Sequence, residues 1–154
     1  MSSSLNELRE FGQRWMDALF NDRNMDAIDE LYAQDYKRND GLAEVDLDSF
    51  KEHNRCFFEA FPDLTYTPVH IVADGDLVVV RWNAEGTFKE DLKMGEMVFT
   101  ATMLPFALRG TDTLRIVDGK IVESWSSLDM AALLAQIDPP IGQRFGEILA
   151  KVFN

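Results

Sequence analysis

Apolar residues at the start of the chain recur every three or four positions, which is the period of one face of an α-helix. The pattern predicts an amphipathic helix whose apolar face consists of Leu5, Leu8, Phe11, Trp15 and Leu19. Ser4 and Glu7 have the spacing of a capping box, so the helix is expected to begin next to Ser4. The polar run 21–24 ends it.

Two more helices are predicted in the first half of the chain. The shorter one carries on one side Met25, Ile28, Leu31 and Tyr32. The polar residues 37–41 are expected to follow it as a loop. The longer helix begins at Asp48 or Ser49 and ends at Phe61, because the ring of Pro62 cannot continue a helix.

The second half of the chain changes to a period of two, which is typical of β-strands. Residues 69–72 and 77–82 flank an aspartate-glycine turn, and this combination predicts a β-hairpin. Residues 104–117 and 120–125 flank a second turn of this kind and predict a second hairpin. Between the two hairpins, residues 86–103 are expected to form a further strand with an irregular start.

The end of the chain returns to helical patterns. Asp129 is expected to cap a helix over 130–137, Pro139 and Pro140 break the chain, and residues 145–152 form a last amphipathic helix. Helices followed by hairpins in one short chain predict an α+β fold. In this fold a curved antiparallel sheet wraps around the N-terminal helices as a cone, and such a cone can enclose a pocket.

Length and charge narrow the partners that such a domain can have. The 154 residues suffice for a single domain with one core. The 15 basic and 27 acidic side chains give a net charge of −12, which repels phosphate groups, so neither nucleic acid nor a membrane is expected as a partner. The single Cys56 cannot form an internal disulfide, and the N-terminus lacks a secretory signal, which together predict a cytoplasmic protein.

Asp112 is the strongest candidate for chemistry. Strand alternation places it on an otherwise apolar face with Leu108, Gly110, Leu114 and Ile116. Burial would disfavour the ionised carboxylate and raise its pKa, which suits a group that exchanges a proton near neutral pH. The structural alternative is an aspartate that pairs with an arginine or with backbone amides, although Arg109 and Arg115 are expected on the opposite face.

Asn54 and His53 form the second candidate group. Asn54 follows the helical spacing of Phe50, Phe57 and Phe61, so its amide is expected on the buried stripe, and His53 flanks that stripe. The two side chains can orient a carbonyl group or exchange a proton, and the alternative is that neighbouring backbone groups satisfy both.

Metal and cofactor sites are not expected. His53 and His70 are the only histidines, they are far apart in the sequence, and no carboxylates stand near them at ligand spacing. The chain has no Gly-rich phosphate loop, no nucleophile elbow and no Cys-x-x-Cys or His-Glu-x-x-His motif.

Further residues are candidates for contacts with a bound substrate. The aromatic candidates are Trp15, Tyr32, Phe58, Trp82, Phe106 and Trp125, although such side chains usually belong to the core. Asn39 and Asp40 stand before Gly41 and are typical of a turn, and a position of Asn39 at the pocket mouth is the alternative. Glu123 shares a strand face with Trp125 and belongs either to a polar rim or to a buried network.

A succession of short motifs resembles the SnoaL-like polyketide cyclase family over about residues 5–137. The motifs are Phe61-Pro62-Asp63-Leu64, Val79-Val80-Arg81-Trp82 before Gly86-Thr87, Asp112 with Arg115, the run Asp118 to Trp125, Asp129 and Leu133-Leu134-Ala135-Gln136. The resemblance implies the nuclear transport factor 2-like fold, which is a cone-shaped α+β barrel around a hydrophobic pocket. It also implies assembly, here expected as a homodimer.

The resemblance further implies chemistry without a cofactor. In the family, a pocket aspartate removes a proton from an activated carbon, so that an intramolecular aldol reaction closes a ring. Here that aspartate would be Asp112, with Asn54 and His53 as the donors that hold the enolate. Two departures alter the pocket wall: Phe88 stands where many members carry a histidine, and residues 95–100 replace a Pro-Thr-Gly-Arg turn.

Three functions are therefore hypotheses. The leading one is an enzyme that acts on a small apolar, carbonyl-bearing or aromatic metabolite through Asp112. The second is a ketosteroid-isomerase-like or epoxide-hydrolase-like enzyme on the same fold, and for the hydrolase a second buried acid, such as Glu123, would help to activate water. The third is a non-catalytic binding or assembly module whose aromatic side chains fill the pocket.

Overall fold

The main element of the fold is a six-stranded sheet, which the computed structural model describes together with the rest of residues 4–39 and 44–153. The strand order is β2-β1-β8-β7-β4-β3. Neighbouring strands are antiparallel except β1 and β8, which run parallel. The strands are β1 (Tyr32–Asn39), β2 (Glu44–Asp46), β3 (Thr65–Asp74), β4 (Leu77–Thr87), β7 (Pro105–Val117) and β8 (Lys120–Leu128).

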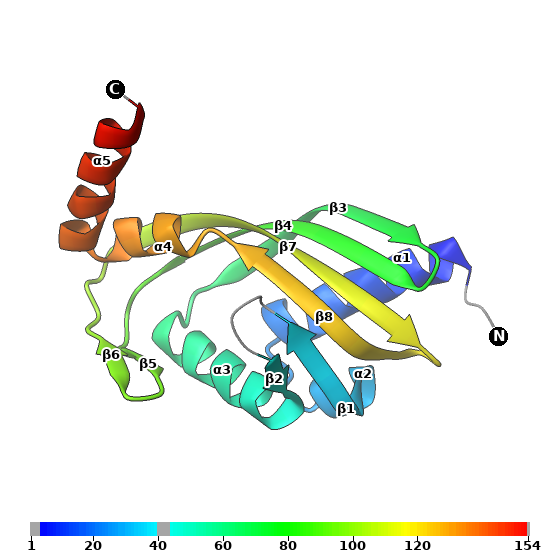
Figure 1. Cartoon of the computed structure of the whole chain (residues 1–154). Helices are drawn as coiled ribbons and strands as arrows, with labels where there is room; N and C mark the ends of the chain where they lie inside the picture. Colours follow the sequence, from blue (N-terminus) through cyan, green and yellow to red (C-terminus); the bar gives the residue numbers. More distant parts are fainter. Residues whose placement is uncertain (1–3, 40–43, 154) are drawn as a thin grey trace.

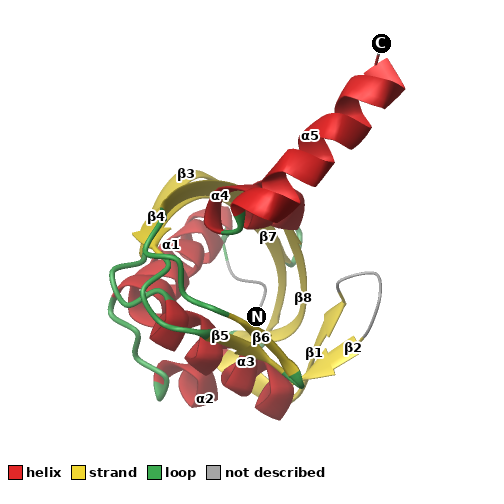
Figure 2. Ribbon diagram, turned by 90° about the vertical axis from the view of Figure 1, so that its left-hand side faces the viewer, coloured by secondary structure: helices red, strands yellow, loops and turns green. Residues whose placement is uncertain are grey.

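The helices divide between the inside of the sheet and its end. Figures 1 and 2 show the sheet curving around α1 and α3, whereas α5 extends away from the domain. The helices are α1 (Leu5–Trp15), its π-helical continuation (Met16–Asn21), α2 (Ala27–Leu31), α3 (Leu47–Ala60), α4 (Met130–Ile137) and α5 (Pro139–Phe153). The predicted α+β fold with a curved sheet around N-terminal helices is confirmed, and the sheet is not closed.

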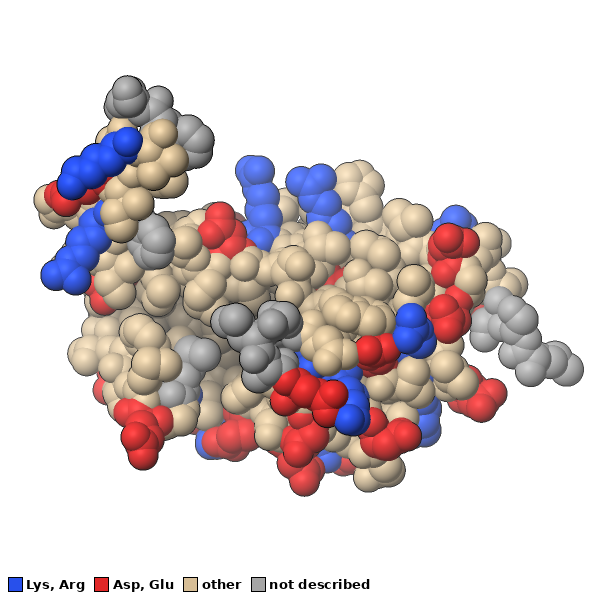
Figure 3. All heavy atoms as spheres, viewed as in Figure 1, with Lys and Arg blue, Asp and Glu red and all other residues tan. Residues whose placement is uncertain are grey.

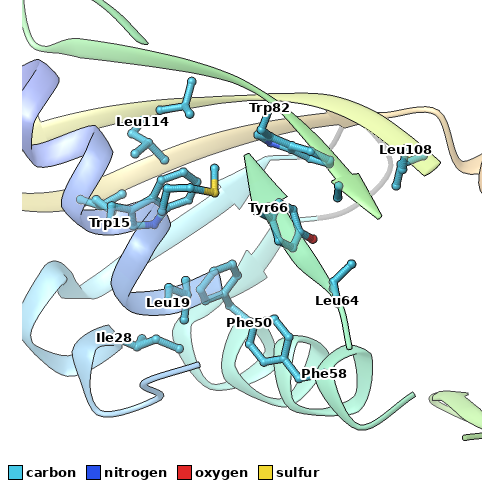
Figure 4. Close-up of a cluster of buried hydrophobic side chains, with 14 of the residues drawn as sticks. Trp15, Leu19, Ile28, Phe50, Phe58, Leu64, Tyr66, Trp82, Leu108 and Leu114 are labelled. Carbon is cyan, nitrogen blue, oxygen red and sulfur yellow. The ribbon is translucent and has the colours of Figure 1, made fainter. Parts of the chain in front are cut away.

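The core lies between the concave face of the sheet and the helices (Figure 4). Trp15 and Leu19 reach into it from α1 and the π-helical turn, and Phe50 and Phe58 reach into it from α3. Trp82 meets them from the sheet. Full burial of a large apolar side chain of this kind contributes roughly 1.5–3 kcal/mol. The apolar positions that recur along the sequence are therefore the ones that pack the helices against the sheet.

The residues between the two long hairpins differ from the expected single strand. They form a separate hairpin of β5 (Leu92–Met94) and β6 (Met97–Phe99) beside α3, with Gly95 in the left-handed region at φ 60°. Phe88 is tied to the returning chain, because its backbone N–H donates to the carbonyl of Leu104 at 3.0 Å. This small hairpin covers the end of α3 rather than extending the main sheet.

The prediction of a loop over residues 37–41 is wrong for the residues that the structure describes. Residues 37–39 form the end of β1, where Lys37 is in register with Glu123 of β8 and with Asp46 of β2. The polar side chains of residues 37–39 give no strand signal in the sequence. The segment forms a strand because it pairs with distant parts of the chain. Asp40 and Gly41, which were expected to form a turn with Asn39, lie outside the described residues.

Two helix boundaries also differ from the expectation. Helix α3 begins at Leu47 instead of residue 48 or 49, because the Asp46 carboxylate accepts a hydrogen bond from the Ser49 backbone N–H at 2.9 Å and acts as the N-cap. Helix α5 begins at Pro139 and includes both prolines in its first turn. Proline is tolerated there, since backbone N–H groups at a helix start have no partner within the helix.

None of the helices within residues 4–39 and 44–153 combines the length and the apolar character that a membrane crossing requires.

Asp63 fastens the chain after α3 to the end of β4. Its Oδ1 accepts a hydrogen bond from the Thr87 backbone N–H at 2.8 Å, and its Oδ2 lies 3.1 Å from the Lys89 ammonium. Burial alone would raise the pKa of Asp63, but the bonds from Thr87 and the contact with Lys89 outweigh it and lower the pKa to about 2.

We expect Asp63→Ala to lower the melting temperature by a few degrees at pH 7. A carboxyl group whose pKa is lowered by folding stabilises the folded state only above its unfolded pKa. The stabilisation is therefore lost as the pH falls from about 4 to about 2. Thermal unfolding of both proteins at pH 7, 4 and 2 measures the effect, with exposed Asp74→Ala as the control. A loss of the same size at every pH would contradict this assignment.

Candidate active site

Asp112 lies on the concave face of the sheet, as strand alternation predicts. It is only 7% exposed, and its neighbours on the same face of β7 include Leu108 and Leu114, which are buried as well. Arg109 is exposed on the other face of this strand. A buried carboxylate needs polar partners, because the loss of its hydration is costly.

Two side chains from the strands on either side of β7 hold the Asp112 carboxylate. Trp82 of β4 donates a hydrogen bond from Nε1 to Oδ2 at 2.6 Å. The Ser126 hydroxyl of β8 donates to Oδ1, and Ser126 is directly in register with Asp112. The carboxylate is thus fixed from both sides in the plane of the sheet.

Gly110 makes the bond from Trp82 possible. The two residues are in register across β4 and β7, and the indole of Trp82 lies directly over Gly110. A Cβ atom at position 110 would overlap the six-membered ring of this indole. The absence of a side chain lets the indole reach along the strand to Asp112, two residues away on the same face.

A cavity of about 150 Å³ lies beside Asp112 between the sheet and α3. Its apolar wall includes Trp15, Phe20, Phe50, Trp82 and Leu108. Its polar wall includes Arg38, Asn54, Tyr66, Asp112, Ser124 and Ser126. Among the described residues, Asp112 is the only acidic side chain that lines this cavity. One buried carboxylate in a cavity with an aromatic wall and a few polar groups is an arrangement suited to proton transfer.

Two tyrosines in the cavity wall keep their protons at neutral pH. The pKa of Tyr32 is raised well above 10, chiefly by burial and then by the neighbouring Tyr36. The hydroxyl oxygen of Tyr32 accepts a hydrogen bond from Trp15 Nε1 at 2.7 Å. Burial raises the pKa of Tyr66 as well, and the negative charge of Asp112 adds to that rise. Both hydroxyls are therefore hydrogen-bond donors rather than bases.

Asn54 and His53 occupy different environments on α3. Asn54 is 9% exposed and lines the cavity as predicted, and its Nδ2 donates to the carbonyl of Phe50 at 2.8 Å. That bond inside the helix is the structural alternative considered for this amide. His53 is exposed and also lines the cavity, which places it at the rim.

Glu123, Trp125 and Asn39 are not brought to the cavity. They gather on the outer face of the sheet, where the guanidinium of Arg115 donates to Glu123 Oε2 at 2.6 Å and lies over the Trp125 ring at 5.2 Å. Asn39 donates to the other carboxylate oxygen of Glu123 at 2.6 Å. The structure thus offers no support for substrate contacts by these three residues.

A β-bulge explains why Glu123 and Trp125 face outward. The pairing of β7 and β8 shifts register between Arg115 and Ile116, which leaves one extra residue on β8. After Ile121, the next buried residue on β8 is therefore Ser124, three positions later, instead of a residue two positions later. Uninterrupted alternation from Ile121 would have turned Glu123 inward.

The six aromatic candidates divide into three groups. Trp15, Tyr32 and Trp82 line the cavity. Phe58 and Phe106 are buried in the core, where the ring of Phe106 packs at 4.9 Å from that of Phe61. Trp125 is on the outer face, as described above.

Sequence reasoning missed Arg38, Tyr66, Ser124 and Ser126. Arg38 belongs to the polar run that was taken for a loop, and its place opposite Ser124 depends on the parallel pairing of β1 and β8. Tyr66 of β3 is buried two positions after buried Leu64, just before the strand, and this alternation is a signal that could have identified it. The serines carry no signal of their own in the sequence.

No group of three or more histidine, cysteine, aspartate or glutamate side chains within residues 4–39 and 44–153 is arranged to hold a metal ion. The Cys56 thiol is half-buried in the cavity wall, and burial, with the neighbouring Glu52, raises its pKa.

Comparison with known sequences identifies one family. The sequence profile described as SnoaL-like polyketide cyclase matches residues 12–137. Among curated proteins, none matches the chain.

Solved structures share the fold over nearly the whole chain. AclR from Streptomyces galilaeus, a proposed hydroxylase, is 24% identical with a TM-score of 0.77, and the alignment covers 91% of this chain and 98% of AclR. A proposed SnoaL-like polyketide cyclase from Jannaschia sp. CCS1 is 18% identical with a TM-score of 0.78, covering 89% and 96%. IdmH from Streptomyces antibioticus, a proposed polyketide cyclase, is 27% identical with a TM-score of 0.68, covering 82% and 95%.

We expect Gly110→Ala to lower the free energy of unfolding by about 1–3 kcal/mol, which is typical of an overpacked core. The added methyl group would push the Trp82 indole off β7 and break its bond to Asp112. Urea unfolding and the near-ultraviolet circular dichroism of the tryptophans measure both effects. Gly146→Ala is the control, because a Cβ there meets no atom within 4 Å. Unchanged stability and spectrum in Gly110→Ala would show that the indole does not need the glycine.

Proposed function

The chain belongs to the SnoaL-like polyketide cyclase family, and we propose that Asp112 is the general base of a cofactor-independent reaction on a small carbonyl-bearing molecule. The observation that carries the proposal is the position of Asp112: its carboxylate is buried, lines the cavity and is held by Trp82 and Ser126. A base with a fixed orientation needs little reorganisation when it takes a proton.

The reaction begins at a carbon next to a carbonyl group. The Asp112 carboxylate takes the proton, and the electron pair of the C–H bond moves toward the carbonyl oxygen and forms an enolate. The enolate carbon then attacks a second carbonyl in an intramolecular aldol reaction, and the resulting alkoxide takes the proton back from Asp112. Alternatively, where the enolate is conjugated with a C=C bond, Asp112 returns the proton to the far carbon, which is an isomerisation. Both outcomes use the same first step.

Water activation by two acids is less well supported than proton abstraction from carbon. The epoxide-hydrolase-like alternative required a second acid beside Asp112, for which Glu123 was the candidate. Glu123 is on the outer face and pairs with Arg115 at 2.6 Å. Among the described residues, the cavity lining contains no acid other than Asp112.

We expect the protein to speed deuterium exchange at the acidic carbons of single-ring β-dicarbonyl compounds, and Asp112→Asn to slow this exchange by about 10²–10⁴-fold. Proton NMR in deuterated water measures the rate. Asp118→Asn in the β7–β8 turn is the matched control, because it makes the same chemical change at an exposed site. Exchange by wild type that is unaffected in Asp112→Asn would rule out Asp112 as the base. No exchange with any compound would favour a non-catalytic binding module.

We also propose that the chain forms a homodimer through α5. This helix extends away from the domain, and its apolar side chains Ile148, Leu149 and Val152 are 55%, 53% and 67% exposed (Figure 2). Figure 3 shows both basic and acidic side chains on α5, which contains Arg144, Glu147 and Lys151. Contact with a second copy would remove the apolar stripe from water. A cytoplasmic location likewise stays a prediction.

Light scattering coupled to gel filtration tests this assembly. We expect twice the chain mass for wild type and a shift toward the monomer for Leu149→Asp, because a charge would be buried in the interface. Ala150→Asp adds the same charge on the opposite face of α5 and should remain dimeric. A monomeric wild type would exclude the homodimer, and a dimeric Leu149→Asp would place the interface elsewhere.

A further inference from the structure

Proton abstraction by Asp112 leaves a new negative charge on the substrate, and the cavity contains donors that this step does not otherwise use. When Asp112 takes the proton, its own charge disappears and an equal charge develops on the substrate oxygen. Hydrogen-bond donors or a positive charge nearby stabilise that oxygen more strongly inside the protein than they would in bulk water. Arg38 and Tyr66 line the cavity and are able to supply both.

The strand register brings Arg38 to the same end of the sheet as Asp112. Arg38 of β1 is in register with Ser124 of β8, and Asp112 of β7 is in register with Ser126. Ser124 and Ser126 are neighbours on one face of β8. Because β8 separates β1 from β7, the backbones of Arg38 and Asp112 lie about two strand spacings apart, roughly 10 Å. The Arg38 side chain lines the cavity from the β1 side of β8.

Tyr66 approaches Asp112 from β3. Its ring packs edge-on against Trp82, with 4.9 Å between the ring centroids, and Trp82 in turn donates to Asp112. Tyr66 is only 9% exposed and lines the cavity. Its protonated hydroxyl is therefore placed to donate a hydrogen bond to an oxygen atom bound there.

The charges of Asp112 and Arg38 both reach the Tyr66 hydroxyl. Burial raises the pKa of Tyr66, the charge of Asp112 raises it further, and the charge of Arg38 lowers it. All three side chains line the same cavity. Tyr66 stays protonated there and keeps a proton to donate.

We propose that the Tyr66 hydroxyl and the Arg38 guanidinium bind the substrate oxygen that becomes negatively charged, so that the cavity selects enolate-like oxyanions of single-ring size. This inference rests on the proposed function and adds its substrate class. Before the step the cavity holds the cation of Arg38 and the anion of Asp112; after it, Arg38 faces the oxyanion and Asp112 is neutral. The sum of charges does not change, which favours the transfer in a poorly polar chamber.

The size limit comes from the volume of the cavity. About 150 Å³ corresponds to a molecule close to benzene in size, or to about five water molecules. The substrate class is therefore a single-ring or short-chain carbonyl compound whose oxygen can carry the enolate charge.

The probe for this inference is 4-nitrophenol, a single-ring acid whose phenolate has its own absorbance band. Asp112→Asn stands for the state in which Asp112 has become neutral. We expect this variant to bind 4-nitrophenolate at least tenfold more tightly than wild type, because the repulsion from the carboxylate is removed. We also expect the bound phenol to ionise at a lower pH than the free phenol, as read from its spectrum.

Substitutions in the Asp112→Asn background assign the two donors. Adding Arg38→Met should weaken phenolate binding at least tenfold and raise the pH at which the bound phenol ionises, and Tyr66→Phe should act in the same direction. Arg38→Lys keeps the charge and should retain part of the binding, so that a folding defect is distinguished from the loss of charge. Arg81→Met, on the outer face, is the matched control. The neutral 4-nitrotoluene should bind all variants alike.

The outcomes separate this inference from the proposed function. Equal phenolate binding with and without Arg38 and Tyr66, or no phenolate binding in Asp112→Asn, would overturn the oxyanion site even if Asp112-dependent exchange is found. Binding that depends on both donors supports the oxyanion site, and the exchange experiment then decides independently whether Asp112 is the base. Equal affinity for nitrophenolate and nitrotoluene would also overturn it, because the site would then recognise only the ring.

Discussion

The burial of one carboxylate on the concave face of the sheet is the constraint around which the rest of the structure is arranged. Asp112 is 7% exposed and must be compensated by donors from the strands on both sides. Trp82 reaches it only because Gly110 has no side chain, and Ser126 reaches it only in the register that β7 and β8 adopt. Side chains from the sheet, α1 and α3 line the space that remains beside this carboxylate.

The two faces of the sheet differ in the polar groups that they carry. On the outer face, Arg115 pairs with Glu123 and covers Trp125, in a cluster that is half exposed and whose contribution to stability is modest. On the inner face, polar groups are few, and most of them are near Asp112. The electrostatic interaction of a charge with its neighbours is stronger in such surroundings than in water, because less solvent is present to screen it. The inner face is therefore where small changes in side-chain position have chemical consequences.

Family membership and local geometry contribute different parts of the functional argument. The family supplies the fold and the type of chemistry that it supports, whereas the solved neighbours below 25% identity bear on the fold alone. The cavity of about 150 Å³, with Arg38 and Tyr66 in its wall, is a property of this chain. The proposed preference for compact substrates that carry their charge on one oxygen rests on this cavity and not on the family.

The sequence by itself determined the class of fold, both long hairpins and the inward position of Asp112, because these depend on local periodicity and on turn residues such as Gly119 at φ 76°. It also placed Asn54 on the buried side of α3. Only the tertiary structure decided the remainder of the site. Arg38 reaches the cavity through the parallel pairing of β1 with β8, which joins strands more than 80 residues apart in the chain. The bulge between β7 and β8 turned Ser124 and Ser126 inward and Glu123 outward. A bulge shifts the alternation of side chains, and the residues of β8 carry no sequence signal that predicts it.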